Sequence, residues 1–98
     1  MERGFGGGAF VTAYNPASRL RSEAENAHWQ SVLEAELQGE HQLYLTAIHR
    51  DPSGKWPDER SCFVLGIEAA SAIELGRRYG QNAIVIYTSG RGAQLEWC

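Results

Sequence analysis

Apolar and polar residues alternate along the chain in a pattern that predicts five strands and two helices. Short segments rich in β-branched and aromatic residues are typical of strands. Such segments occur at 9–14, 43–50, 61–67, 83–88 and 93–97. The segment at 61–67 is a continuous apolar run, which favours a central strand. The turn at 89–92 predicts that the last two strands form a hairpin.

Two longer segments carry helix signals. Ser22 and Glu25 form an S-x-x-E capping box at the start of the first helix. Gly39 suits the end of that helix, and Gly80 the end of the second, which is expected over 68–80. The apolar stripe of the first helix is expected at Trp29, Val32, Leu33 and Leu37, at helical spacing.

The predicted order of elements is β-α-β-β-α-β-β. Its first six elements match the split βαβ, or ferredoxin-like, pattern, in which two helices cover one face of an antiparallel sheet. The fold class is therefore a two-layer α+β sandwich with an additional C-terminal edge strand. A different mixed α+β sheet is the alternative. Residues 9–98 form a single domain, and residues 1–8 form a flexible glycine-rich lead-in.

Composition narrows the class of protein further. The 98 residues are 43% apolar and 21% charged, which is ordinary for a globular domain. A formal net charge of −3 argues against binding nucleic acid mainly through phosphates. There is no apolar run of membrane-spanning length and no signal-peptide core. With two cysteines in the chain, a reducing cytoplasmic location is expected.

Sequence motifs predict neither a metal site nor a cofactor. His28, His41 and His49 lack the spacing of metal ligands. The glycine-rich segment at 4–8 precedes a strand rather than opening a helix, so it is not a convincing phosphate loop.

The predicted topology brings the distinctive polar residues to one end of the sheet. In this arrangement, the ends of the first two strands lie beside the starts of the next two. The first helix begins at that end, and the second helix finishes there. The candidate ligand-binding residues are Asn15, Ser18, Asn26, Trp56, Glu59, Ser61, Arg77 and Gln81.

Several segments resemble a family of uncharacterised bacterial proteins known as DUF3293. They are FVTAYNPAS at 10–18, EN at 25–26, GKWPDERSCFVLGI at 54–67 and GRRYGQNAIV at 76–85. The residues that match the family pattern are Thr12, Ala13, Asn15, Pro16, Ser18, Asn26, Trp56, Pro57, Glu59, Ser61, Gly80 and Gln81. The resemblance covers roughly residues 10–90 and implies a small bacterial domain, with no catalytic assignment.

Each candidate residue also has a structural interpretation. The Asn15–Ser18 segment could simply be an Asx-type turn that ends a strand. Trp56 could cover the end of the core instead of stacking on a ligand. Glu59 could pair with Arg50, Arg77 or Arg78, and Arg77 and Arg78 could merely complement the helix dipole. Gln81 could satisfy loop backbone.

The leading functional hypothesis is a non-catalytic binding or interaction module. It would hold a small polar or anionic ligand, or a protein segment, and could form a homodimer through an edge strand. The alternative is a small enzyme with Glu59 as acid/base, Ser61 or Ser18 orienting the substrate and an arginine holding an anionic group. A third hypothesis is single-stranded nucleic-acid binding, which a basic stripe of Arg50, Arg60, Arg77 and Arg78 would favour.

Overall fold

The computed structural model of the chain describes residues 7–98. The elements in chain order are β1 (Gly7–Val11), the short 3-10 helix η1 (Pro16–Ser18), α1 (Glu23–Gly39), β2 (Tyr44–His49), β3 (Glu59–Leu65), α2 (Ala69–Arg78), β4 (Ala83–Thr88) and β5 (Gly92–Trp97). The seven predicted elements therefore occur in the predicted order. Gly7 and Gly8 belong to β1, whereas the rest of the predicted lead-in, residues 1–6, lies outside the described residues.

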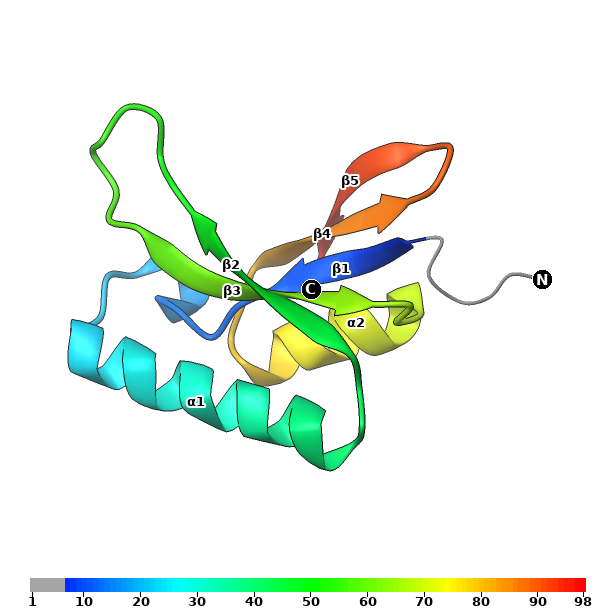
Figure 1. Cartoon of the computed structure of the whole chain (residues 1–98). Helices are drawn as coiled ribbons and strands as arrows, with labels where there is room; N and C mark the ends of the chain where they lie inside the picture. Colours follow the sequence, from blue (N-terminus) through cyan, green and yellow to red (C-terminus); the bar gives the residue numbers. More distant parts are fainter. Residues whose placement is uncertain (1–6) are drawn as a thin grey trace.

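The five strands form one antiparallel sheet in the order β2-β3-β1-β4-β5. Figure 1 shows both helices on the same side of this sheet, and the β2–β3 loop and the tip of the β4–β5 hairpin pointing away from them. α1 packs on β3, while α2 packs on β1 and β4. The two-layer α+β class and the added edge strand β5 are as predicted.

Alternate residues along the strands divide the sheet into a covered face and an open face. The side chains under the helices form the core, with contributions from Ala9, Val11, Leu33, Leu37, Cys62, Val64, Ala72, Leu75 and Ile84. The open face carries Phe10 opposite Phe63 and Val85 on the neighbouring strands. The rings of Phe10 and Phe63 are 4.7 Å apart between centroids. This open face is apolar but is not covered by any helix of the described chain.

The buried stripe of α1 differs from the predicted one. Trp29 and Val32 are exposed, at 44% and 36%, so their expected place in the core was wrong. Instead Asn26 and Gln30 are buried, at 3% and 0%, in line with Leu33 and Leu37. Gln30 is tolerated there because its Oε1 accepts from the backbone N–H of Ala13 at 3.0 Å.

Both ends of α1 lie where the sequence predicted them. One half of the capping box is confirmed, because the Glu25 backbone N–H donates to Ser22 Oγ at 3.1 Å. The Glu25 side chain accepts from the Ser22 hydroxyl, at 3.0 Å, instead of from the Ser22 backbone N–H. At the other end, Gly39 lies inside the last turn. The residue in the left-handed conformation is His41, with φ of 57°. The helix therefore ends at the predicted glycine, while the left-handed residue follows two positions later.

Candidate functional site

The segment after β1 has an unusual backbone. Asn15, Ala17 and Ser18 all have positive φ, at 44°, 57° and 59°. Asparagine enters this region more readily than most residues, whereas alanine and serine do so at a cost. Backbone strain of this kind persists only where the surroundings hold it in place.

The connection between α2 and β4 holds this segment. The Ala17 backbone N–H donates to the Gly80 carbonyl at 2.7 Å. Gly80 itself has φ of 75°, and a Cβ at this position would lie 2.7 Å from Pro16 Cβ. A glycine is thus required both for the local conformation and for the close approach of the two segments.

Two buried asparagines fix the loop to α1. The Asn15 backbone N–H donates to Asn26 Oδ1, and Asn26 Nδ2 donates to Asn15 Oδ1, both at 2.9 Å. Arg21 adds donors to the same two oxygens, from Nε to Asn26 at 3.1 Å and from its backbone N–H to Asn15 at 2.8 Å. These bonds satisfy nearly all the polar atoms of Asn26, so its role here is to position the Asn15 loop.

Glu59 connects that loop to the tryptophan of the β2–β3 connection. Its Oε2 accepts from Trp56 Nε1 at 2.6 Å and from Asn15 Nδ2 at 2.8 Å. Within residues 7–98 Glu59 forms no ion pair with an arginine, so its structural partners are an indole and an amide. Glu59 Oε1 accepts no hydrogen bond from any of these residues and remains open to a ligand.

Gln81 and Ser18 complete the polar rim. Gln81 Nε2 donates to the carbonyls of Tyr14 and Tyr79, at 3.0 and 3.4 Å. Asn82 Nδ2 donates to Ser18 Oγ at 3.0 Å. Gln81 thereby satisfies loop backbone, as its structural interpretation predicted, while its Oε1 stays free of partners among the described residues.

These side chains enclose a hollow of about 340 Å³, which we call the loop pocket. Its lining residues are Tyr14, Asn15, Ser18, His49, Trp56, Glu59 and Gln81. Five of the eight predicted site residues thus lie around one hollow, and Asn26 supports it from behind. This convergence is what the predicted topology required.

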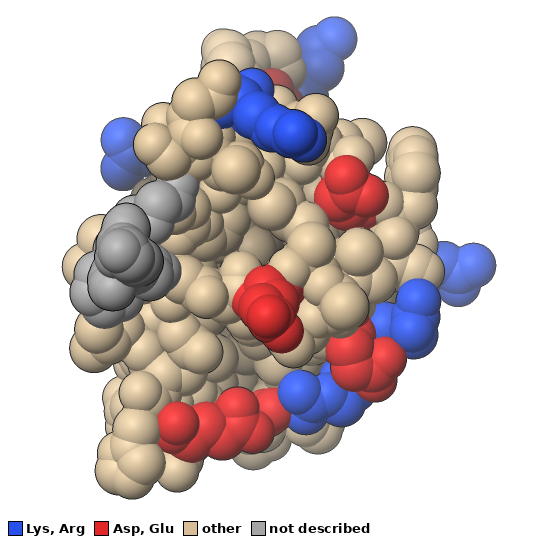
Figure 2. All heavy atoms as spheres, turned by 90° about the vertical axis from the view of Figure 1, so that its right-hand side faces the viewer, with Lys and Arg blue, Asp and Glu red and all other residues tan. Residues whose placement is uncertain are grey.

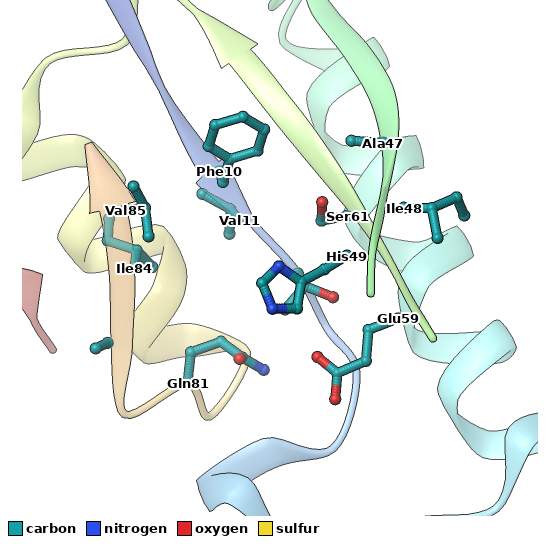
Figure 3. Close-up of a pocket in the computed structure, with 12 residues that line it drawn as sticks. Phe10, Val11, Ala47, Ile48, His49, Glu59, Ser61, Gln81, Ile84 and Val85 are labelled. Atoms are coloured by element: carbon teal, nitrogen blue, oxygen red, sulfur yellow. The ribbon is translucent and has the colours of Figure 1, made fainter. Parts of the chain in front are cut away.

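A second hollow of about 430 Å³ adjoins the loop pocket on the open face of the sheet, and we call it the sheet trough. The two hollows share His49, Glu59 and Gln81. Figure 3 shows the trough over β1, between β4 on one side and β2 and β3 on the other. The residues that line it are Phe10, Val11, Thr12, Ala47, Ile48, His49, Glu59, Ser61, Gln81, Ala83, Ile84 and Val85.

Ser61 belongs to the trough. It is 7% exposed, and its hydroxyl makes no hydrogen bond to any residue in the range 7–98. In Figure 3 this hydroxyl is drawn at the trough, on the same side as the His49 ring. A buried hydroxyl without a partner is disfavoured in a fold, so one bordering a hollow points to a bound group or water.

His49 was not among the predicted site residues. It lies directly opposite Glu59 in the β2–β3 register, and its ring points into the trough in Figure 3. The spacing of the histidines along the chain bears only on metal binding and gives no sign of this position. The signal available was the hairpin itself: two strands joined by a loop at 50–58 place the residues flanking that loop side by side.

Arg77 does not join the site. Its guanidinium pairs with Glu74 at 3.1 Å on the exposed side of α2, away from both hollows. The last turn of α2 lies at the predicted end of the sheet, but it directs the Arg77 side chain away from the hollows. Arg78 likewise turns to Glu36 of α1.

The proposed basic stripe is not formed by the described residues. Arg50 pairs with Asp58 and Arg60 with Glu34, so the four arginines of the expected stripe contact four different carboxylates. On the face drawn in Figure 2, most of the surface is uncharged, and basic side chains lie mainly along its margin among acidic ones. Within residues 7–98, no lysine or arginine lines either hollow.

Neither the buried thiol of Cys62 nor the acidic and histidine side chains of the described residues form a further reactive site. Burial is the main cause that raises the pKa of the Cys62 thiol to about 12, so it stays protonated at neutral pH. In the part of the chain that the structure covers, no group of three or more His, Cys, Asp and Glu side chains is placed to bind a metal. A separate hollow of about 590 Å³ lies at the opposite end of the molecule, beside Glu40, Glu74 and Arg78.

Comparison with known proteins assigns the chain to a family but not to an activity. Residues 11–84 match the family described as "Protein of unknown function (DUF3293)", and the chain belongs to that family. No curated protein and no solved structure matches it. Among residues 7–98 there is no helix with the length and apolar character needed to span a bilayer.

Proposed function

We propose that this chain is a small, non-catalytic binding module that holds a small molecule at one end of its sheet. The observation that carries the proposal is the continuity of the loop pocket with the sheet trough. The combined hollow is bordered by polar atoms without protein partners in residues 7–98, namely Glu59 Oε1, the Ser61 hydroxyl and the His49 ring. Concave, mainly apolar sites with a few convergent polar groups are typical of small-molecule binding.

We propose that the first four strands and both helices form a ferredoxin-like unit. The strand order β2-β3-β1-β4, with antiparallel pairing throughout, supports this assignment. β5 then extends the sheet at one edge.

We also propose a bacterial cytoplasmic setting, which the two unpaired cysteines and the family resemblance support.

Self-association through an edge strand is a further part of the proposal. β5 ends the sheet and carries Leu95 and Trp97, which are 57% and 73% exposed. An exposed edge with apolar side chains is a template for pairing with a second strand. The contact we propose is antiparallel pairing of two copies of β5.

A small enzyme remains the second candidate, because His49 and Glu59 line the same hollow. Glu59 would serve as acid/base, and Ser61 would orient the substrate. The arginine expected to hold an anionic group is not at the hollow, so an anionic substrate has less support than a neutral or cationic one. Single-stranded nucleic acid has the least support, since the basic stripe is not formed.

An amide NMR titration tests these candidates together. Labelled protein is titrated with pooled amines, amino acids, organic acids, nucleosides and a short RNA. We expect one pool to shift the amides of residues 47–49, 59–61 and 81–85, with no new signals from a reaction product. Product signals would favour the enzyme, and the relaxation rates report whether the chain is a dimer. If no pool shifts these amides, the binding proposal is wrong.

A further inference from the structure

The polar end of the combined hollow is rich in acceptors. Glu59 uses Oε2 for Trp56 and Asn15, so its free Oε1 can only accept as a carboxylate. Gln81 uses Nε2 as a donor to two backbone carbonyls, which leaves Oε1 as the atom available to a ligand. The indole and amide donors of this rim, on Trp56, Asn15 and Gln81, are therefore already engaged with protein atoms, while these two acceptors are not. The Ser61 hydroxyl and the His49 ring, which also have no partner in residues 7–98, lie on the side of the trough.

The charged side chain that lines the combined hollow is negative. Glu59 is the acidic residue that lines it, and among the described residues no lysine or arginine does so. Arg21, the nearest arginine in the network, directs Nε to Asn26 Oδ1 and Nη2 to the Ala13 carbonyl. An anionic group placed here would meet a carboxylate without a compensating cation.

An aromatic side chain stands beside that carboxylate. Trp56 lines the loop pocket together with Glu59, and its Nε1–H bond to Glu59 Oε2 fixes the position of the indole. Tryptophan is the aromatic residue with the strongest attraction for an organic cation. A carboxylate and an indole side by side are thus suited to an ammonium group.

The trough that leads away from this end is lined mainly by apolar side chains. Small side chains, Ala47 and Ser61, lie on its β2–β3 side, and larger ones, Phe10 and Val85, lie on β1 and β4. Figure 3 shows Phe10, Ala47 and Val85 along the trough, with His49, Glu59 and Gln81 toward its polar end. This shape suits an aromatic or aliphatic body joined to a polar head.

We propose that the ligand is a primary amine with an apolar body. Its ammonium group donates to Glu59 Oε1 and Gln81 Oε1 beside Trp56, and its body lies in the sheet trough. This inference rests on the proposed binding function and adds the chemical class of the ligand. It differs from the sequence-based expectation of an anionic ligand, which depended on Arg77.

Three probes with the same phenylethyl body separate the effect of the head group. They are 2-phenylethylamine, 2-phenylethanol and 3-phenylpropanoate, which carry a cationic, a neutral and an anionic head. Ligands of about ten non-hydrogen atoms bind with dissociation constants on the order of mM, so amide NMR is the suitable measurement. We expect the amine to bind about tenfold or more tightly than the acid, with shifts at residues 47–49, 59–61 and 81–85.

Glu59→Gln is the decisive variant. Its side-chain oxygen can still accept from Trp56 and Asn15, while its NH₂ group replaces the ligand-facing acceptor with a donor. We expect the amine to bind about tenfold more weakly to this variant and the acid to bind no more weakly than before. Glu68→Gln removes the same charge before α2 at the opposite end of the sheet, and should leave all three affinities unchanged.

The outcomes separate this inference from the proposed function. If the acid shifts the same amides and binds as tightly as the amine, the ligand class is wrong and the binding site stands. If Glu59→Gln and Glu68→Gln weaken the amine equally, the contact with Glu59 is wrong. If none of the three probes shifts these amides, the ligand class is wrong, and the pooled titration decides whether the binding function stands.

Discussion

At the residue scale, the site depends on a few positions where one particular side chain, or none, is tolerated. Asn15 adopts a left-handed conformation and contributes three polar groups to the network, its backbone N–H, Oδ1 and Nδ2. Gly80 approaches Pro16 too closely for any side chain. These positions explain why the loop after β1 and the α2–β4 connection stay together: their contacts are specific rather than a consequence of general burial.

Gly80→Ala tests this contact. The new methyl group meets Pro16 Cβ at 2.7 Å in addition to the strain of a positive φ. We expect the free energy of unfolding in urea to fall by about 2–3 kcal/mol. Gly54→Ala is the matched control, because Gly54 has the same φ of 75° with nothing within 4 Å of its added Cβ. That variant should lose about 1 kcal/mol, and equal losses would contradict the proposed contact.

At the element scale, two tyrosines bond to α1 from different parts of the chain. The Tyr14 hydroxyl, after β1, donates to Glu23 Oε2 at 2.7 Å, and the Tyr79 hydroxyl, after α2, donates to Glu36 Oε1 at 2.8 Å. Burial first, and then the hydrogen bond to glutamate, raises the pKa of each tyrosine to about 12. Both contacts therefore require the neutral phenol.

Alkaline pH should loosen this attachment. The pKa of each tyrosine is higher in the folded chain than its ordinary value of 10, so the stabilisation is complete below pH 10 and is lost as the pH rises towards 12. We expect a loss of about 1–2 kcal/mol per tyrosine after allowance for solvent screening. The measurement is the free energy of unfolding at pH 8 and pH 11.

The double variant Tyr14→Phe, Tyr79→Phe is the comparison for this pH effect. It lacks both phenols and should lose less stability between the two pH values than the original chain. Cys62, whose pKa is also raised to about 12, is present in both proteins and does not affect the difference. An equal loss in the two proteins would contradict the assignment of the alkaline sensitivity to the tyrosines.

Element type and order could be predicted from the sequence because periodicity and turn residues act locally. The convergence of Asn15, Trp56, Glu59 and Gln81 followed from the topology alone, since strand directions decide which ends meet. The direction of helical side chains could not be predicted in the same way. Asn26 and Gln30 are buried because distant backbone groups need their amides, and an apolar stripe gives no sign of this.

The same limit explains the errors at the site. Arg77 lies near the correct end of the sheet, but its guanidinium pairs with Glu74 within its own helix. His49 was missed because its importance arises from the residue opposite it on another strand, Glu59. The spacing of Arg77 and Glu74 within one helix, and of His49 and Glu59 on paired strands, can be seen in the sequence. Which partner each side chain contacts in preference to others depends on the final packing.

At the scale of the whole molecule, the sheet has one face covered by helices and one face open. The hydrogen-bonded loops gather at one end, and the trough on the open face leads to that end. Two kinds of polar residue are found there. Asn26 has partners for its polar atoms and maintains the fold, whereas Ser61 is buried without a partner among residues 7–98.

The most direct test of a ligand site at this end needs no ligand. It compares the change in the free energy of unfolding caused by Ser61→Ala with the change caused by Asn26→Ala. The account predicts that Ser61→Ala changes stability by less than about 0.5 kcal/mol or raises it, because the hydroxyl has no structural partner. Asn26→Ala should lose about 2 kcal/mol or more. A comparable loss in Ser61→Ala would contradict the account, since the hydroxyl would then belong to the structural network and not to a site.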